Sequence, residues 1–440
     1  MIFTKIRPLL IQFALVCTIF FAAAGLIAYG RGYRIDINKK SLTPTGLLVA
    51  TSDPTGSELL VDNKLITATN ATINLAPNWY AIKIIKEGYI PWEKQIRVQG
   101  EILARADATL FPSNPSLATI TTTGVSHPSV SPDGTKLAFV VPNGTNASES
   151  ARLDEKRAGI YVLDLVDKPL SLLNRDARRI VSNEILDWSN ALLTWSPNAK
   201  QLLVTAGQTL FQLDPDKTND TPRPIFNKDV LMSEWEELEK TKQKEKIGGL
   251  KESLLNVATA SMNIISFSPD ETKILYEASV SGTIPPIIKP SLIGSNPTKE
   301  DRVLVPKHLY VYDIKEDKNY PLGPTSAFTR TSNNQAFLTT KPRTNEPSFS
   351  VIPSGVEGSS KSFSSSYQLS WLPTSLHLVV ATSKGIDIME YDGTNRATVY
   401  AGPFLDGFVT PWATGMKLVI LTNLNPTASS LPNLYSVNLR

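Results

Sequence analysis

A ten-residue phrase that recurs through most of the chain limits the fold more than any other feature. It reads Val-Ser-Pro-Asp-Gly-Thr-Lys-Leu-Ala-Phe at 130–139. Close copies occupy 195–204 and 267–276, weaker copies begin at Trp371 and Trp412, and a degenerate copy centres on 333–337. Each copy joins turn-forming residues to an apolar run, so the sequence predicts a series of similar β-hairpins.

The chemistry of a tight turn explains the composition of the phrase. Proline fixes φ at the second turn position, Asp or Asn suits the third, and Gly134 accepts a positive φ at the fourth. We therefore expect a structural role in turns for Pro132, Asp133, Gly134, Pro197, Asn198, Pro269 and Asp270.

The spacing of the copies indicates the size of the repeating unit. The position of Lys136 recurs at 200, 273, 335, 377 and 417. The last intervals are about 40 residues, the length of a four-stranded propeller blade, and the longer ones fit a blade plus an insertion. Apolar runs that we expect to end the blades lie at 160–165, 210–214, 309–314 and 386–392. The sequence thus predicts an all-β fold with six or seven propeller blades over 113–440.

The phrase resembles the repeat of WD-repeat-like β-propellers of the TolB-like family. Blades of that family carry Ser-Pro-Asp-Gly before an apolar strand, and the copies at 130–139 and 267–276 match this pattern well. The resemblance implies a radial array of sheets with few exposed edges. It also implies a binding surface at the channel rim or broad face, where loops from all blades converge.

Residues 45–112 have the pattern of a second, smaller β domain. Turn residues separate alternating runs at 47–51, 57–61, 79–86, 95–98 and 106–110, which favours a small sandwich. The segments 52–62, 75–80 and 86–92 resemble the PEGA domain, with Thr55 and Ser57 replacing its Glu and Ala. This resemblance implies an adhesive or spacer module of envelope proteins, without catalytic activity.

Four aromatic residues of this domain have two interpretations. Trp79, Tyr80, Tyr89 and Trp92 would form a carbohydrate-stacking face if they pointed the same way. We favour the alternative, in which some pack the sandwich core and the others cover its edges.

The segment 9–29 is uncharged and contains only Gln12 as a strongly polar residue. About 20 helical residues span the roughly 30 Å core of a bilayer. We expect a transmembrane helix that contacts membrane lipid through 9–29, between a short tail at 1–8 and a linker at 30–44. A signal peptide cleaved near 22–24 and a lipoprotein at Cys17 are the alternatives.

The orientation of this helix is open from charge alone. Basic residues flank it on both sides, and their simple count favours a cytoplasmic C-terminal domain. Long domains translocate largely regardless of nearby charge, and the family resemblances favour an extracytoplasmic one. We therefore predict a single-pass protein of the cell membrane with its large domain outside.

Two segments interrupt the β pattern of the blades. Residues 229–257 carry Leu231, Trp235 and Leu238 at helical spacing, and Glu236 can pair with Lys240 one turn later. They predict a helical insert, either docked through its apolar stripe or free to bind a partner. Residues 342–366 are rich in Ser, Pro and Gly, which predicts a flexible loop.

The composition excludes several kinds of function. Lys and Arg number 44 and Asp and Glu 41, so no global positive field attracts nucleic acid. No nucleophile elbow, phosphate loop or dinucleotide fingerprint occurs in the sequence. The histidines at 127, 308 and 377 are far apart, and Asp214, Asp216 and Asp220 lack the glycine and glutamate of a calcium loop.

We therefore expect no cofactor, no metal and no enzymatic activity. The leading hypothesis is a membrane-anchored scaffold or protein-binding module of the cell envelope. A surface protein that binds cell-wall polysaccharide is the first alternative, and an enzyme with a diverged propeller site is the second.

Overall fold

The computed structural model describes residues 3–30, 33–36, 41–143, 157–166, 177–184, 186–328, 369–382, 384–405, 407–424 and 431–440. It divides into two compact units. The first comprises 1–111 with 289–299, and the second comprises 112–288 with 300–440. The degenerate phrase at 333–337 and the predicted flexible loop at 342–366 lie outside the described residues.

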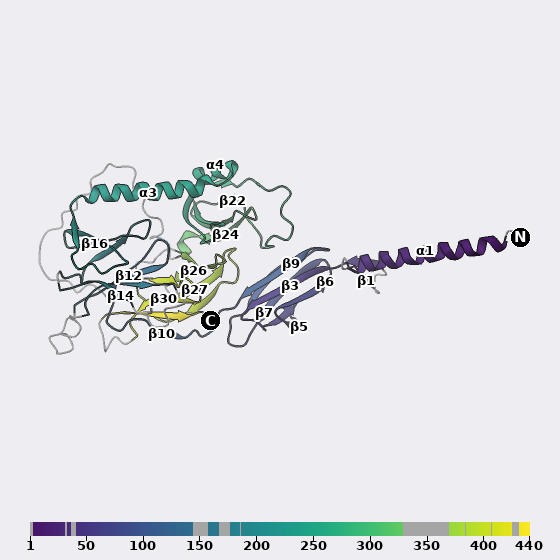
Figure 1. Ribbon diagram of the computed structural model, residues 1–440, viewed down its shortest axis with the longest axis horizontal. Helices are drawn as coiled ribbons and strands as arrows, with labels where there is room; N and C mark the ends of the chain where they lie inside the picture. The colour runs from purple at the N-terminus through teal and green to yellow at the C-terminus, as the bar shows by residue number, and fades with distance from the viewer. Residues whose placement is uncertain are drawn as a thin grey trace. The chain divides into compact units, whose positions relative to one another are not determined.

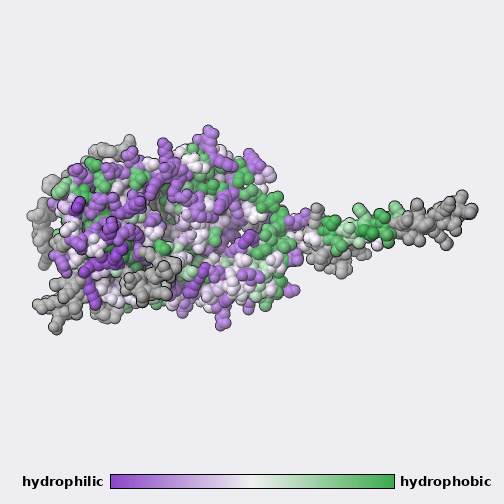
Figure 2. Space-filling view, in the orientation of Figure 1, coloured by the Kyte–Doolittle hydropathy of each residue, from purple (hydrophilic) through white to green (hydrophobic). Residues whose placement is uncertain are grey.

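Helix α1, Phe3–Gly30, begins the first unit (Figure 1). Eight large apolar side chains between Phe13 and Ile27 are exposed, each by 61–72%. Figure 2 shows this stretch as an apolar surface. Within the described residues, no helix combines the length and hydropathy required to cross a lipid bilayer. A two-stranded hairpin, β1 (Tyr33–Asp36) with β2 (Ser41–Pro44), follows α1.

Two small sheets form the rest of the first unit, in the orders β6-β3-β9 and β5-β4-β7-β8. Their strands are β3 (Gly46–Asp53), β4 (Glu58–Val61), β5 (Lys64–Ala68), β6 (Ala71–Leu75), β7 (Asn78–Ile85), β8 (Trp92–Val98) and β9 (Leu103–Thr109). β3 and β9 are parallel, and every other pair is antiparallel. All five strands predicted here are present. β5 and β6 were not predicted: all five residues of β5 are exposed, whereas β6 is a short strand whose apolar and polar residues do alternate.

Alternation places the core of this unit between its two sheets. Leu48 and Ala50 on β3, Ile82 and Ile84 on β7, and Trp92 on β8 are all buried in one cluster. Side chains on a strand point alternately to opposite faces, so each sheet contributes one apolar face.

Five four-stranded antiparallel sheets make up most of the second unit, consistent with the blades of a propeller. We number them blades 1 to 5. Blade 1 contains β11 (Ser126–Val130), β12 (Lys136–Val141), β13 (Gly159–Asp164) and β14 (Arg178–Ser182); blade 2 contains β15 (Leu192–Trp195), β16 (Leu202–Ala206), β17 (Thr209–Leu213) and β18 (Arg223–Ile225). Blade 3 contains β19 (Met262–Phe267), β20 (Lys273–Ala278), β23 (His308–Asp313) and β24 (Lys318–Pro324). Blade 4 contains β25 (Leu369–Trp371), β26 (His377–Thr382), β27 (Gly385–Glu390) and β28 (Ala397–Tyr400).

Blade 5 is built from both ends of the second unit. It contains β29 (Val409–Pro411), β30 (Lys417–Thr422) and β31 (Asn433–Asn438), and its outermost strand is β10 (Leu117–Thr119) from the beginning of the unit. The Asn433 side-chain oxygen accepts from Thr121 Oγ1 at 3.1 Å and from Gly124 N–H at 2.9 Å, which adds side-chain bonds to this closure.

Neighbouring blades share apolar clusters. β12 and β13 pack with β16 and β17 on one side and with β30 and β31 on the other. β20 and β23 pack directly with β25, β26 and β27. The described residues therefore form five blades where the spacing predicted six or seven. Blades 3 and 4 are direct neighbours, although the degenerate phrase lies between them in sequence.

The predicted helical insert is present as α3, Lys228–Gly248, and α4, Glu252–Ser261 (Figure 1). Trp235 is the buried residue of α3, and the predicted ion pair forms between Lys240 Nζ and Glu236 Oε1 at 2.7 Å. Leu254 and Ala258 of α4 belong to the apolar cluster of blade 3. Blade 3 also carries a short hairpin of β21 (Gly282–Thr283) and β22 (Val303–Leu304) between β20 and β23.

The apolar runs expected to end the blades are the third strands instead. β13, β17, β23 and β27 occupy the predicted positions, and each is followed by a fourth strand. The fourth strands lie on the outer edge of each sheet, where β14 and β18 mix charged with apolar residues and β28 mixes polar with apolar residues. That mixture gives no clear alternation in sequence.

Candidate functional site

Serine closes the turn between the first and second strands of blade 1. The Ser131 hydroxyl donates to Asp133 Oδ1 at 2.6 Å and accepts from Lys136 N–H at 2.9 Å. Blades 2 and 3 repeat both bonds, through Ser196 with Asn198 and Ser268 with Asp270. The turn residues predicted from the phrase thus lie in three equivalent hairpins, where they bond to the turn itself.

The carboxylates of these turns are held in the charged form. Burial alone would raise the pKa of Asp270, but hydrogen bonds from Ser268 and Thr272 outweigh it and lower the pKa to about 2. The same balance, with donors from Ser131 and Thr135, lowers the pKa of Asp133. Aspartate is therefore present in these turns as a hydrogen-bond acceptor.

The fourth turn position has a positive φ in all five blades. Its residues are Gly134 (69°), Ala199 (58°), Glu271 (56°), Ser375 (60°) and Gly415 (71°). Glycine is therefore present at two of five positions that share the left-handed conformation. The other three copies keep this backbone conformation with a residue other than glycine.

The backbone bonds also define which residues are equivalent. Ser196 N–H donates to Gln201 O, as Ser131 N–H does to Lys136 O, so Gln201 and not Lys200 matches Lys136. In blade 5, Trp412 N–H donates to the carbonyl of Lys417, which places Trp412 at the position of Ser131.

The two ends of the blades differ in their connections. Neighbouring strands are antiparallel, so connections from strand 1 to 2 and from 3 to 4 lie at one end. Connections from strand 2 to 3 and from one blade to the next lie at the other. The longest connections, 142–158, 226–261, 279–307 and 325–368, all leave and re-enter the strands at this second end. Two of them also reach the first end, where Lys242 of the helical insert donates to Pro197 O and Asp317 holds the chain at 287–288. We call it the insertion end.

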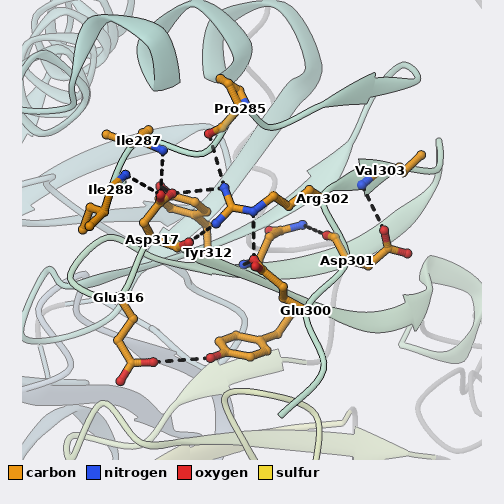
Figure 3. A network of polar contacts seen from close by, with 12 residues as sticks. Pro285, Ile287, Ile288, Glu300, Asp301, Arg302, Val303, Tyr312, Glu316 and Asp317 are labelled. Atoms are coloured by element: carbon orange, nitrogen blue, oxygen red, sulfur yellow. Dashed lines mark hydrogen bonds and ion pairs between the residues drawn. The ribbon is translucent and has the colours of Figure 1, made fainter. Parts of the chain in front are cut away.

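A network of polar contacts fixes the insertion of blade 3 (Figure 3). Asp317, in the turn between β23 and β24, is its centre. Asp317 Oδ2 accepts from the N–H groups of Ile287 and Ile288 at 2.6 and 2.8 Å. Its Oδ1 accepts from the Tyr312 hydroxyl at 2.7 Å and from Arg302 Nη1 at 3.2 Å.

Arg302 completes the network from the other side of the insertion. Its Nη1 donates to Pro285 O at 3.2 Å and its Nη2 donates to Asp317 O. Its Nε lies 3.0 Å from Glu300 Oε2. Asp317 and Arg302 together hold the chain before 289 and after 299, and we call this pair with its partners the clamp.

The electrostatics of the clamp favour the ionised forms. Burial alone would raise the pKa of Asp317, but bonds from the Ile288 and Ile287 amides, Tyr312 and Arg302 lower it below its ordinary value. Burial and the bond to Asp317 raise the pKa of the Tyr312 hydroxyl. Both carboxylate oxygens already accept two bonds, so this geometry suits holding a loop better than transferring a proton.

The clamp residues were not predicted from the sequence. Arg302 and Asp317 stand 15 positions apart, outside the phrase and outside any motif. The one signal for their region was the long interval between the third copy and the degenerate copy of the phrase, which indicated an insertion without its contacts.

The four aromatic residues considered as a stacking face do not share one exposed surface. Trp92 is buried in the sandwich core, and Tyr80 and Tyr89 pack against that core. Trp79 is the exposed member and adjoins Tyr80 on β7, so their side chains leave opposite faces. The arrangement corresponds to core and edge packing.

The aspartates and histidines considered as metal or acid–base residues do not form one cluster. Lys136 pairs with Asp216 at 2.6 Å, and Lys217 pairs with Asp214 at 3.1 Å. His377 is buried opposite Glu390 in the β26–β27 ladder. In the part of the chain that the structure describes, no three His, Cys, Asp or Glu side chains are placed to hold a metal ion.

The innermost strands of the five blades are uncharged. Their sequences contain Ser, Thr, Asn, His, Pro and apolar residues but no Asp, Glu, Lys or Arg. A pair of carboxylates for glycoside cleavage is therefore not present on β11, β15, β19, β25 or β29.

Comparison with known proteins identifies one domain of the chain. Residues 45–114 match the family described as PEGA domain. This confirms the resemblance seen in the sequence and extends it by two residues. A comparison with curated proteins gives no match.

Solved structures that match the chain include TolB proteins. The putative TolB from Agrobacterium tumefaciens is 12% identical, with 69% of this chain and 76% of that chain covered and a TM-score of 0.21. TolB from Acinetobacter baumannii is 12% identical, with coverages of 82% and 59% and a TM-score of 0.19. An oligogalacturonate lyase in complex with manganese is 10% identical, with coverages of 89% and 88% and a TM-score of 0.20.

Proposed function

We propose that this chain is a membrane-anchored scaffold of the cell envelope that binds another protein and has no catalytic activity of its own. The observation that carries the proposal is the exposure of eight large apolar side chains on α1, by 61–72% each. An exposed apolar surface of this kind needs a partner, and a helix with apolar residues all round suits lipid.

The described part of the structure contains no helix that meets the length and hydropathy of a membrane span, so this part of the proposal rests on the sequence of the segment and its flanks. The uncharged segment 9–29 fits a bilayer core of roughly 30 Å at 1.5 Å per residue. Lys5 and Arg7 precede it and Arg31 and Arg34 follow it, at positions where cations reach the headgroups. We place the C-terminal units outside the cytoplasm, as the family resemblances suggest.

The distribution of insertions supports binding at one end of the blades. Insertions in repeat folds gather on the binding face, because loops tolerate change while the repeat supplies rigidity. Here the four longest connections all leave the strands at the insertion end, and the clamp fixes the one at 279–307 by tying its middle to the β23–β24 turn. A fixed insertion loses little conformational freedom when a partner binds, which favours affinity.

The proposal that the chain lacks catalysis has two supports. The innermost strands are uncharged, and the clamp carboxylate is saturated with donors. The PEGA-domain match over 45–114 fits a spacer between membrane and blades.

Membrane extraction and protease accessibility test the anchor. We expect the full-length chain to stay in the membrane pellet at high pH and high salt, and external protease to digest the blades in intact cells. Phe20→Asp should release the chain, because a charge at the helix centre opposes insertion by about 2.5–3.5 kcal/mol. Phe20→Leu is the matched control and should remain in the pellet. A full-length chain that is soluble without detergent contradicts the proposal.

Crosslinking in cells tests the binding end. A photoreactive residue at Val280, exposed in the blade 3 insertion, should yield a discrete heterologous adduct. The control position is Met416, exposed in the blade 5 turn at the opposite end. Equal adducts from both positions, or none from Val280, would count against a binding surface at the insertion end.

A further inference from the structure

One end of the sandwich receives the chain from α1. β3 begins there at Gly46, and its parallel neighbour β9 begins beside it, with Leu47 opposite Leu103. β7 begins at the same end, because Asn78 pairs with Val98 and the chain turns from there into β9. Three strand starts thus define the end nearest the anchor in sequence.

The segment 289–299 joins this end from a distant part of the sequence. It belongs to the same compact unit as residues 1–111. A Cβ added at Gly294 would lie 3.5 Å from Leu103 O and 3.9 Å from Ile102 Cγ2. The tip of the segment therefore lies against the start of β9.

Exposed apolar side chains gather at this end. They are Leu47 (38%), Trp79 (49%), Leu103 (47%), Leu292 (45%) and Ile293 (74%). We call these five residues the collar. The collar combines four aliphatic side chains with one tryptophan, the residue that favours the boundary between lipid and water.

The charges around the collar are mainly positive. Lys289 and Lys299 are exposed on either side of the Leu292–Ile293 tip, and 289–299 contains no acidic residue. Exposed Arg97 pairs with Trp79 across β7 and β8. Exposed Glu101 is the acidic residue of the neighbouring turn. Apolar side chains flanked by cations match the interfacial zone of a bilayer with anionic headgroups.

We propose that the collar contacts the lipid surface that α1 enters, and so holds the sandwich against the membrane. This inference rests on the proposed anchor, because α1 brings this end of the unit to the bilayer. The collar adds apolar contacts at the interface, while Arg97, Lys289 and Lys299 meet the headgroups with their cations. The anchored chain then has a restricted orientation at the membrane.

Fluorescence quenching in vesicles tests the collar. The full-length chain carries Cys17→Ser and Ile293→Cys, and the new thiol is labelled with an environment-sensitive probe. The chain is reconstituted in vesicles of phosphatidylcholine and phosphatidylglycerol that contain a quencher lipid labelled near the headgroup. We expect about twofold quenching, reduced when Lys289→Glu and Lys299→Glu are combined or when phosphatidylglycerol is omitted.

Leu65→Cys provides the matched control. Leu65 is an exposed aliphatic residue on β5 of the same sandwich. It pairs with Leu60 of β4, which pairs in turn with Lys83 in the middle of β7, so Leu65 lies away from the collar end. A probe at this position should retain its emission. Equal quenching at both positions would indicate a chain lying flat on lipid and would overturn the collar.

The remaining outcomes separate the two proposals. A chain that does not float with the vesicles overturns both the anchor and the collar. A chain that floats, with an unquenched probe at 293, overturns the collar alone. An unquenched probe that crosslinks to the same position of a second copy assigns the collar to self-association instead.

Discussion

At the residue scale, the repeated turn retains a backbone conformation more faithfully than a residue type. A left-handed φ brings Cβ close to the backbone, which costs about 1 kcal/mol or more for a residue other than glycine. Ala199, Glu271 and Ser375 all occupy this conformation. The neighbouring hydrogen bonds of each turn compensate for it.

Ala199→Gly should therefore stabilise the protein. We expect a gain of about 0.5–1 kcal/mol in the free energy of unfolding, measured by denaturant titration. The reverse change, Gly134→Ala, should cost a similar amount, because open space surrounds the added Cβ and only φ opposes it. A loss of stability in Ala199→Gly would contradict the argument.

Asp270 makes stability depend on pH in the acid range. Its pKa is lowered from 3.8 to about 2 in the folded chain. A carboxylate with a depressed folded pKa contributes stability above its unfolded pKa, and the contribution is lost as pH falls between these values. We expect the free energy of unfolding to fall from about pH 4 to pH 2, and Asp270→Asn to flatten that slope. Asp62→Asn, in a turn of the sandwich, is the control.

At the scale of elements, tryptophan links the innermost strands of neighbouring blades. Trp195 Nε1 donates to Ser129 O at 2.9 Å, and Trp371 Nε1 donates to Ser266 Oγ at 3.2 Å. Ser129, Ser266 and Ser370 each stand one residue before the position that tryptophan occupies in blades 2 and 4. Blade 5 carries Pro411 where blades 2 and 4 carry tryptophan, so it has no indole N–H to donate to the neighbouring blade at this position. The buried Ser370 Oγ accordingly has no hydrogen-bond partner in the described structure.

Ser266→Ala and Ser370→Ala should differ in effect. Removing the Ser266 hydroxyl leaves the Trp371 indole N–H without its acceptor, at a cost of about 1–2 kcal/mol in unfolding free energy. Removing the Ser370 hydroxyl breaks no bond and should be neutral or stabilising. Thermal and denaturant unfolding of the two variants distinguish them, and an equal loss in both would refute the explanation.

The clamp should contribute more than an exposed ion pair. Asp317→Asn removes the charge facing Arg302 and places an amide donor against other donors, so we expect a loss of about 3 kcal/mol. Asp107→Asn is the comparison, because its pair with Arg105 is exposed and should be worth about 1 kcal/mol or less. Similar losses in both variants would show that burial adds nothing to the clamp.

At the scale of the whole molecule, the second unit is closed by strands from its two ends. Residues that pair across β10 and β31, such as Thr119 and Tyr435, are more than 300 positions apart in the sequence. Crosslinking such a pair removes far more freedom from the unfolded chain than crosslinking a hairpin.

A disulfide between Thr119→Cys and Tyr435→Cys should therefore stabilise the chain strongly, with Cys17→Ser as background. We expect about 2–3 kcal/mol more than from a Leu192→Cys and Thr205→Cys pair within blade 2, by the ratio of loop lengths. Reducing agent should abolish both gains. Failure of the long-range pair to oxidise would contradict closure by β10 and β31.

The sequence by itself determined the elements whose chemistry is local. Turn residues and apolar alternation predicted the phrase hairpins, the PEGA domain and the helical insert, because φ preferences and side-chain periodicity act over a few residues. The tertiary structure decided the number of blades in the described chain, the supply of β10 to blade 5, the clamp and the collar. These depend on contacts such as Arg302 with Asp317 or Gly294 with Leu103, between residues whose separation along the chain carries no periodic signal. Only packing of the whole chain brings such residues together.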